Sequence, residues 1–131
     1  MRKLFIAALI ITAAFGFAPA QQDSTQQSLE KITRLARAPQ SVDGVGRAVI
    51  VVSDKDGNPI QNAYAKMDSV WGGDHFCESW GSTNSQGAIA LNPIHMGKLK
   101  LMVKAKGYEA QKVEVDAGSL SEPVHVTLAR K

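Results

Sequence analysis

The sequence predicts an all-β protein, a seven-stranded antiparallel β-sandwich preceded by a signal peptide and a short helical linker. From about Gly46 onward, apolar and polar residues alternate with a period of two, which is typical of strands that bury one face. Clusters of Gly, Pro, Asn and Asp interrupt this alternation about every ten residues, as expected for short strands joined by turns.

The first 20 residues have the pattern of a cleavable export signal. Basic residues at positions 2 and 3 precede an apolar run over 4–17, and Ala18-Pro19-Ala20 supplies small residues for cleavage. The run is shorter than the ~20 residues of a membrane-spanning helix, so we expect no membrane span after cleavage. The sequence therefore predicts a secreted or periplasmic protein of the cell envelope.

Residues 21–45 are predicted to form a polar linker with a short helix. Leu29, Ile32 and Leu35 recur at helical spacing, and Pro39 follows as a stop signal. The β domain is then expected to span residues 46–131.

Seven segments of this domain are expected to be strands. They are RAVIVVSD (47–54), NAYAKMDSV (62–70), HFCESWGST (75–83), GAIALNP (87–93), KLKLMVKAKGY (98–108), AQKVEVD (110–116) and PVHVTLAR (123–130). The residues expected to face inward are Ala63, Ala65, Met67, Leu99, Leu101, Val103, Ala105, Val113, Val115, Val124, Val126 and Leu128.

Charge and cysteine content narrow the function classes. The formal net charge of +3 includes Arg2 and Lys3, and removal of residues 1–20 leaves 13 basic against 12 acidic side chains. This balance gives no electrostatic case for nucleic acid. The one cysteine, Cys77, cannot form an internal disulfide, so it is a free thiol, an intermolecular bridge or a buried apolar residue.

Three motifs follow one another along the β region: VSDKDGNPIQNA (52–63), TNSQGAI (83–89) and LMVKAKGY (101–108). In this order they resemble the carboxypeptidase regulatory-like domain, a transthyretin-like (prealbumin-like) sandwich of Ig-like architecture. The matching residues mark a fold and not a site. Asn62, Asn84 and Ile89 stand where the family usually has glycine, aspartate and an aromatic residue. The change at Asn84 counts against cation binding by that turn.

The segment VWGGDHFCESWG (70–81) concentrates the chemically versatile residues. Our candidates for ligand binding are Trp71, Asp74, His75 and Trp80. Aromatic residues beside a glycine-rich turn suit a binding loop, but large aromatic side chains are also common at the ends of a core.

The same segment contains an H-x-x-E pattern, His75 to Glu78, of the kind that binds zinc in metallocarboxypeptidases. Residues i and i+3 lie on opposite faces of a strand, so His75 and Glu78 are not expected to share a metal. His75 and Cys77, with His95 or His125, have ligand types that suit zinc, which makes them weak metal candidates. We assign no metal site, no cofactor and no catalytic residue.

The leading functional interpretation is an exported, non-enzymatic structural or protein-interaction module. Its partner would be an envelope or extracellular protein that contacts an edge strand or a loop. The alternative is a carbohydrate- or peptide-binding module that uses the Trp71–Trp80 loop. A third, weaker alternative is a small metal- or thiol-dependent protein, such as a hydrolase, that uses His75 and Cys77.

Overall fold

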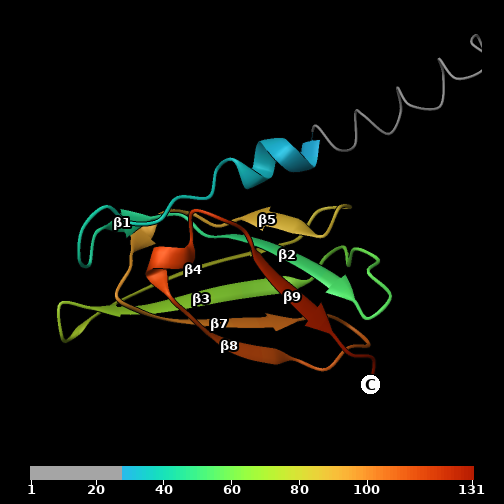
Figure 1. The fold of residues 1–131 in the computed structure, drawn as a ribbon. Coiled ribbons are helices and arrows are strands. Elements are labelled where there is room, and N and C mark those ends of the chain that lie inside the picture. The colour runs from blue at the N-terminus through green and yellow to red at the C-terminus, as the bar shows by residue number, and fades with distance from the viewer. Residues whose placement is uncertain (1–27) are drawn as a thin grey trace, which may run out of the picture. The chain divides into compact units, whose positions relative to one another are not determined.

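A computed structural model describes residues 28–131 of the protein (Figure 1). The predicted signal peptide and the start of the predicted linker lie outside the described residues. A short helix covers residues 28–33, within the segment where the sequence predicts one. In the part of the chain that is described, no helix has the length and apolarity needed to cross a membrane.

From Ile32 onward the chain forms one compact unit built mainly from two sheets. The first sheet has the order β5 (Ala88–Ala90), β2 (Val49–Asp54) and β9 (Val124–Leu128). The second has the order β4 (His75–Ser82), β3 (Tyr64–Trp71), β7 (Lys98–Lys104) and β8 (Gln111–Val115). Figure 1 shows them as two layers. A two-stranded sheet joins β1 (Val45–Gly46) to β6 (Ile94–His95), and a 3-10 turn, η1 (Ala117–Ser119), connects β8 to β9.

The core lies between these two sheets and consists of the apolar residues that alternate along each strand. On β7, Leu99, Leu101 and Val103 are buried while Lys98 and Lys100 are exposed, as the sequence predicts. The buried core cluster comprises Ala48, Ile50, Val52, Ile60, Ala63, Ala65, Met67, Leu91, Met96, Leu99, Leu101, Val103, Leu120, Val126 and Leu128. The all-β prediction is therefore confirmed at the level of class and layers.

One detail of the predicted sandwich is wrong, and one inward residue is less covered than expected. The strands β2 and β9 pair in parallel, with Ile50 opposite Val124, so the fold is not entirely antiparallel. Val113 shares the inner face with its partner Leu101, as expected, but 38% of it is exposed. It lies on β8, the edge strand of the four-stranded sheet, where the three-stranded layer does not cover it fully.

Two turns of the same design connect strands at one end of the sandwich. In the first, Asp54 Oδ1 accepts hydrogen bonds from the backbone N–H groups of Asp56 and Asn58, both at 2.9 Å. In the second, Asn84 Oδ1 accepts from the N–H groups two and four residues later, at 2.9 and 3.1 Å. Gly57 and Gly87 occupy the fourth position with φ of 84° and 73°. The side chain thus serves as an acceptor for backbone groups, a task that amide and carboxylate oxygens perform equally well.

A buried threonine ties the segment before β3 to the end of β4. Thr83 is 3% exposed, and its hydroxyl donates to the Ile60 carbonyl at 2.6 Å and accepts from the Ala63 N–H at 2.9 Å. Backbone bonds from Thr83 N to Ala63 O and from Asn62 N to Thr83 O flank this contact. One hydroxyl therefore satisfies two buried backbone groups that have no strand partner.

The segment before β2 also pairs with the rest of the unit. Arg37 and Arg47 exchange two backbone hydrogen bonds of 2.9 and 2.8 Å, and the Gly44 carbonyl accepts from the Met96 N–H at 2.9 Å. Residues 37–47 therefore lie against β6 and help to position the candidate site.

Candidate functional site

The β3–β4 hairpin positions most of the candidate residues. Its loop has three residues, Gly72, Gly73 and Asp74, because Trp71 pairs directly with His75. Both glycines have positive φ, 61° and 90°, which an L-residue with a side chain adopts only with strain. The double glycine thus allows the tight reversal that brings Trp71 and His75 side by side.

On the inner side of this hairpin, Trp71 stacks with two imidazoles. The Trp71 and His75 ring centroids are 4.5 Å apart, and those of Trp71 and His95 are 4.1 Å apart, with interplanar angles of 20° in both pairs. His75 comes from β4 and His95 from β6, so the stack joins the large sheet to the small one. Such ring pairs contribute about 0.5–1.5 kcal/mol beyond the area that they bury.

Two aspartates hold the imidazoles in place. His95 Nδ1 lies 2.9 Å from the backbone carbonyl of Asp43, and His75 Nδ1 lies 3.3 Å from Asp74 Oδ1. The Asp43 carboxylate also accepts a hydrogen bond of 3.1 Å from the Gly72 N–H. Asp43 therefore connects the hairpin loop, His95 and the segment before β1.

A concavity of about 570 Å³ lies beside Trp71. It is lined by Pro39, Ser41, Val42, Asp43, Val70, Trp71, Gly72, Gly73, Met96, Gly97, Lys98, Ala117 and Gly118. Trp71 Nε1 is buried and has no hydrogen-bond partner among the described residues. Of the three stacked rings, only that of Trp71 lines the concavity.

The metal and thiol interpretations gain little from this arrangement. Cys77 is a half-buried free thiol whose Sγ donates to the His95 carbonyl at 3.3 Å. His125 lies on β9 in the other sheet. Within residues 28–131, no group of three or more His, Cys, Asp or Glu side chains has the geometry of a metal site.

The H-x-x-E pair is split, as the sequence analysis predicts. His75 stacks on Trp71 on the inner side of the sheet, whereas Glu78 pairs with Lys66 on the outer side. His75 and Glu78 of the H-x-x-E pattern are therefore strand residues that make separate contacts on opposite faces of the sheet.

Trp80 lies away from Trp71. It is opposite Lys66 on the outer face of the four-stranded sheet, while Trp71 is at the end of β3 on the inner side. Trp80 is 57% exposed, and two further apolar residues on that face, Phe76 and Val70, are 59% and 43% exposed. The structure thus brings Trp71, Asp74 and His75 together and places Trp80 in a second surface, which we call the outer patch (Val70, Phe76 and Trp80).

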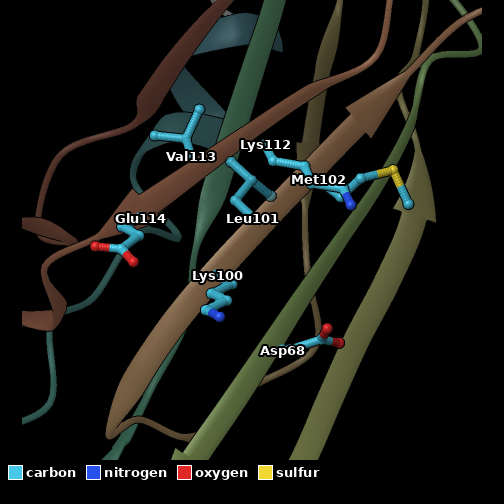
Figure 2. Close-up of a pocket in the computed structure, with 7 residues that line it drawn as sticks. All are labelled: Asp68, Lys100, Leu101, Met102, Lys112, Val113 and Glu114. Atoms are coloured by element: carbon cyan, nitrogen blue, oxygen red, sulfur yellow. The ribbon is translucent and has the colours of Figure 1, made fainter.

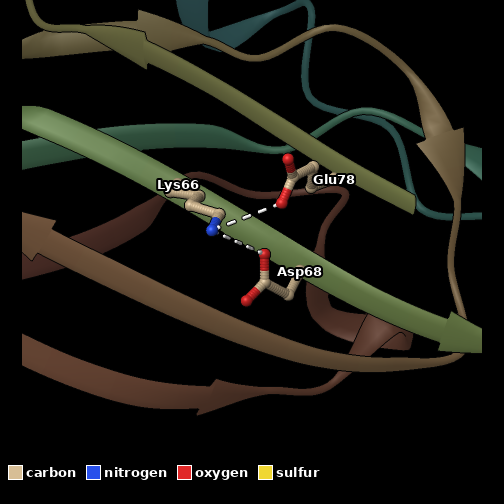
Figure 3. Close-up of polar contacts among 3 residues, drawn as sticks. All are labelled: Lys66, Asp68 and Glu78. Carbon is tan, nitrogen blue, oxygen red and sulfur yellow. Dashed lines mark ion pairs between the residues drawn. The ribbon is translucent and has the colours of Figure 1, made fainter. Parts of the chain in front are cut away.

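An ion-pair cluster lies next to the outer patch. Lys66 Nζ is 3.3 Å from Glu78 Oε2 and 3.7 Å from Asp68 Oδ1 (Figure 3). The hydrogen bond to Glu78, and after it the charge of Asp68, raises the pKa of the Lys66 ammonium above its ordinary value. The side chains are about one-third exposed, so the cluster organises the surface more than it stabilises the fold.

The outer face continues toward β8 as a groove of about 420 Å³ (Figure 2). Its lining is Asp68, Lys100, Leu101, Met102, Lys112, Val113 and Glu114. Lys100 lies between Asp68 of β3 and Glu114 of β8 in the strand register, so acidic and basic side chains alternate across this face. The face is therefore polar near β8 and apolar near β4.

Sequence reasoning missed Phe76 and Val70 as surface residues and Asp43 as a support for the candidate site. Strand alternation contained the first signal, because Phe76, Glu78 and Trp80 share parity and the acid marks their common face as solvent-exposed. No local signal marks Asp43, which meets Gly72 and His95 only through tertiary contacts.

Comparison with known proteins assigns no relationship. No protein-family model matches the chain, and no curated protein sequence matches it significantly.

Proposed function

We propose that this chain is an exported, non-enzymatic β-sandwich module that binds another protein of the cell envelope along β4. The observation that carries the proposal is the edge of the four-stranded sheet that has no neighbouring strand. β4 is the terminal strand of that sheet and has eight residues, an edge about 26 Å long. Among the described residues, no backbone group of β4 bonds to the backbone of any segment other than β3.

The residues of β4 lack the features that normally block edge-to-edge pairing. Proteins protect edges with lysine, proline, bulges or very short strands. β4 reads HFCESWGS, and its one charged side chain, Glu78, is engaged by Lys66. By contrast, β8 carries Lys112 and Glu114, β5 has only three residues, and β9, the other edge of the three-stranded sheet, has five against the eight of β4. β4 is therefore the long edge best suited to accept an added strand.

The outer patch supplies apolar contact area beside this edge. Aromatic residues are enriched in protein interfaces and often carry much of the binding energy. Trp80 and Phe76 project from β4 itself, so a strand added to β4 would lie next to both rings. The backbone edge would provide affinity and the two rings selectivity.

We further propose membership of the carboxypeptidase regulatory-like family and export directed by residues 1–20. The three resembling motifs support the first proposal, because they coincide with the two acceptor turns and with β7 and the turn after it. Export predicts that the secreted protein begins at Gln21, which N-terminal mass spectrometry would measure.

The carbohydrate- or peptide-binding alternative needs Trp71 and Trp80 on one surface, and the two rings lie on opposite faces of the sheet. The metal or thiol alternative needs a reactive Cys77, whose thiol is hydrogen-bonded to the His95 carbonyl. Neither the placement of the two tryptophans nor the hydrogen-bonded Cys77 thiol favours these two alternatives over protein binding along β4.

Site-specific photocrosslinking in the cells that naturally make the protein tests the proposal. A benzophenone amino acid replaces Phe76, on the edge, or Val42, which is 93% exposed and lies outside the sheet. We expect one protein adduct of defined mass from position 76 and none from position 42. Adding Trp80→Lys, which places a second positive charge opposite Lys66 and costs some stability, should abolish the adduct at position 76 in a protein whose thermal midpoint shows that it is still folded. Identical adducts at both positions, or an adduct that Trp80→Lys leaves unchanged, would refute edge binding.

A further inference from the structure

The end of the sandwich near the C-terminus (Figure 1) holds a concavity of about 390 Å³ that shares no lining residue with the outer patch. Its lining is Asn62, Tyr64, Lys104, Ala105, Lys106, Tyr108, Ala110 and Lys131. The lining thus combines three lysines and two tyrosines with no acidic side chain. This composition is unusual for a chain whose acidic and basic side chains are nearly balanced beyond residue 20.

The fold gathers these residues from three distant segments. In the β3–β7 register, Tyr64 lies opposite Lys104. A turn after β7, closed by the hydrogen bond from Tyr108 N to Ala105 O, carries Lys106. The Glu109 N–H donates to Ala129 O and the Lys131 N–H donates to Gly107 O, so the last residues are held against this turn. Strand pairing and backbone bonds therefore fix the positions from which the three lysines project.

The three lysines of the concavity, Lys104, Lys106 and Lys131, are not paired with acidic side chains among the described residues. Lys104 Nζ instead lies 5.5 Å from the centroid of the Tyr64 ring, and Arg130 lies 5.5 Å from that of Tyr108. Glu109 belongs to the same turn but does not line the concavity. Like charges held close together favour binding of an anion.

We propose that this concavity binds an anionic sugar residue of a glycan. The lysines would pair with its carboxylate, sulfate or phosphate group. The tyrosine rings and the Asn62 amide would contact the sugar ring and its hydroxyl groups. A sugar is favoured over an acidic peptide, because aromatic rings and a neutral amide line the concavity together with the cations. This site is distinct from the β4 edge, so either proposal can fail without the other.

Calorimetric titration of the purified full chain tests the proposal. The probes are a tetragalacturonate, which carries carboxylates, a heparin tetrasaccharide, which also carries sulfates, and neutral cellotetraose. We expect saturable binding of at least one anionic sugar and none of cellotetraose. Raising the salt concentration from about 0.05 to 0.5 M should weaken binding, because exposed charges are screened.

A matched pair of double variants locates the site. Lys104→Gln with Lys106→Gln should weaken binding at least tenfold. Lys98→Gln with Lys100→Gln removes the same charge at the same spacing from the other end of β7 and should change affinity less than twofold. All four lysines are exposed, so both variants should fold like the wild type, as checked by their thermal midpoints.

The proposal would be overturned by no binding of either anionic tetrasaccharide, by equal losses in the two double variants, or by equally tight binding of tetraglutamate. The last result would show that the site recognises negative charge without a sugar ring. Inorganic sulfate that bound as tightly as the heparin tetrasaccharide would exclude the ring contacts in the same way.

Discussion

Replacing Thr83 with valine should reveal how much the fold depends on one buried hydroxyl. Valine keeps the shape of threonine but removes the donor to Ile60 O and the acceptor from Ala63 N, bonds of 2.6 and 2.9 Å. Ile60 and Ala63 are 7% and 0% exposed, so water cannot replace the lost partners without local opening. A buried backbone group left unsatisfied costs about 1–3 kcal/mol. Thr83→Val leaves two such groups unsatisfied, and the burial of a methyl group in place of the hydroxyl offsets part of the cost. We therefore expect the free energy of unfolding to fall by about 2–4 kcal/mol.

Urea denaturation at neutral pH measures this loss through the unfolding midpoint. With a slope of about 1–2 kcal/mol per molar for a domain of this size, the midpoint should fall by at least about 1 M. Thr83→Ser keeps the hydroxyl and should recover most of the loss. Thr127→Val, an exposed position on β9, should stay within about 0.5 kcal/mol of the wild type. A Thr83→Val midpoint equal to that of the wild type would show that the hydroxyl does not support the segment before β3.

Two further predictions concern the core and the first acceptor turn. Leu101→Ala should lower the free energy of unfolding by about 2–5 kcal/mol, because Leu101 is 1% exposed. Lys100→Ala, at an exposed position, should be nearly neutral in the same denaturation assay. Equal effects of the two substitutions would contradict the assigned inner face of β7. The pKa of Asp54 is lowered, chiefly by the hydrogen bond that its carboxylate accepts from the Asn58 N–H. The ionised carboxylate therefore stabilises the folded state at pH values above its ordinary pKa. This stabilisation is lost as the pH falls through the lowered pKa. Asp54→Asn should remove the dependence of stability on the ionisation of this side chain. The wild type should therefore lose more stability than the variant between about pH 6 and pH 2.5. Parallel curves of stability against pH for the two proteins would contradict a stabilising role of the Asp54 carboxylate.

The sequence predicts strand positions well where local alternation decides them. Leu99, Leu101 and Val103 show the pattern clearly, because each inward side chain is flanked by an outward one that is polar or partly exposed. The exposure of Val113 could not be predicted in this way. Alternation tells which residues share a face, but only tertiary structure tells whether another layer covers that face at an edge strand.

The candidate site was predictable only in part, for the same physical reason. The short loop with two glycines makes the proximity of Trp71 and His75 a local property of the hairpin. His95 joins them because it belongs to β6, which pairs with β1. β6 has only two residues, so no periodic pattern in the sequence could predict it. Separation of the two tryptophans depends on the hairpin register, which a single sequence leaves open.

The parallel pairing of β2 with β9 has a consequence for the order of folding. Ile50 of the first long strand finds Val124 only when nearly the whole chain is present, and loop closure over such a separation makes folding slow. Until β9 arrives, β2 has a single short neighbour, the three-residue β5, and the layer that should cover the four-stranded sheet is incomplete. We therefore expect the sandwich to be completed only after β9 has been synthesised. The same topology leaves the finished domain dependent on its last strand, so truncation within β9 should expose the buried face of β2 and unfold the whole sandwich.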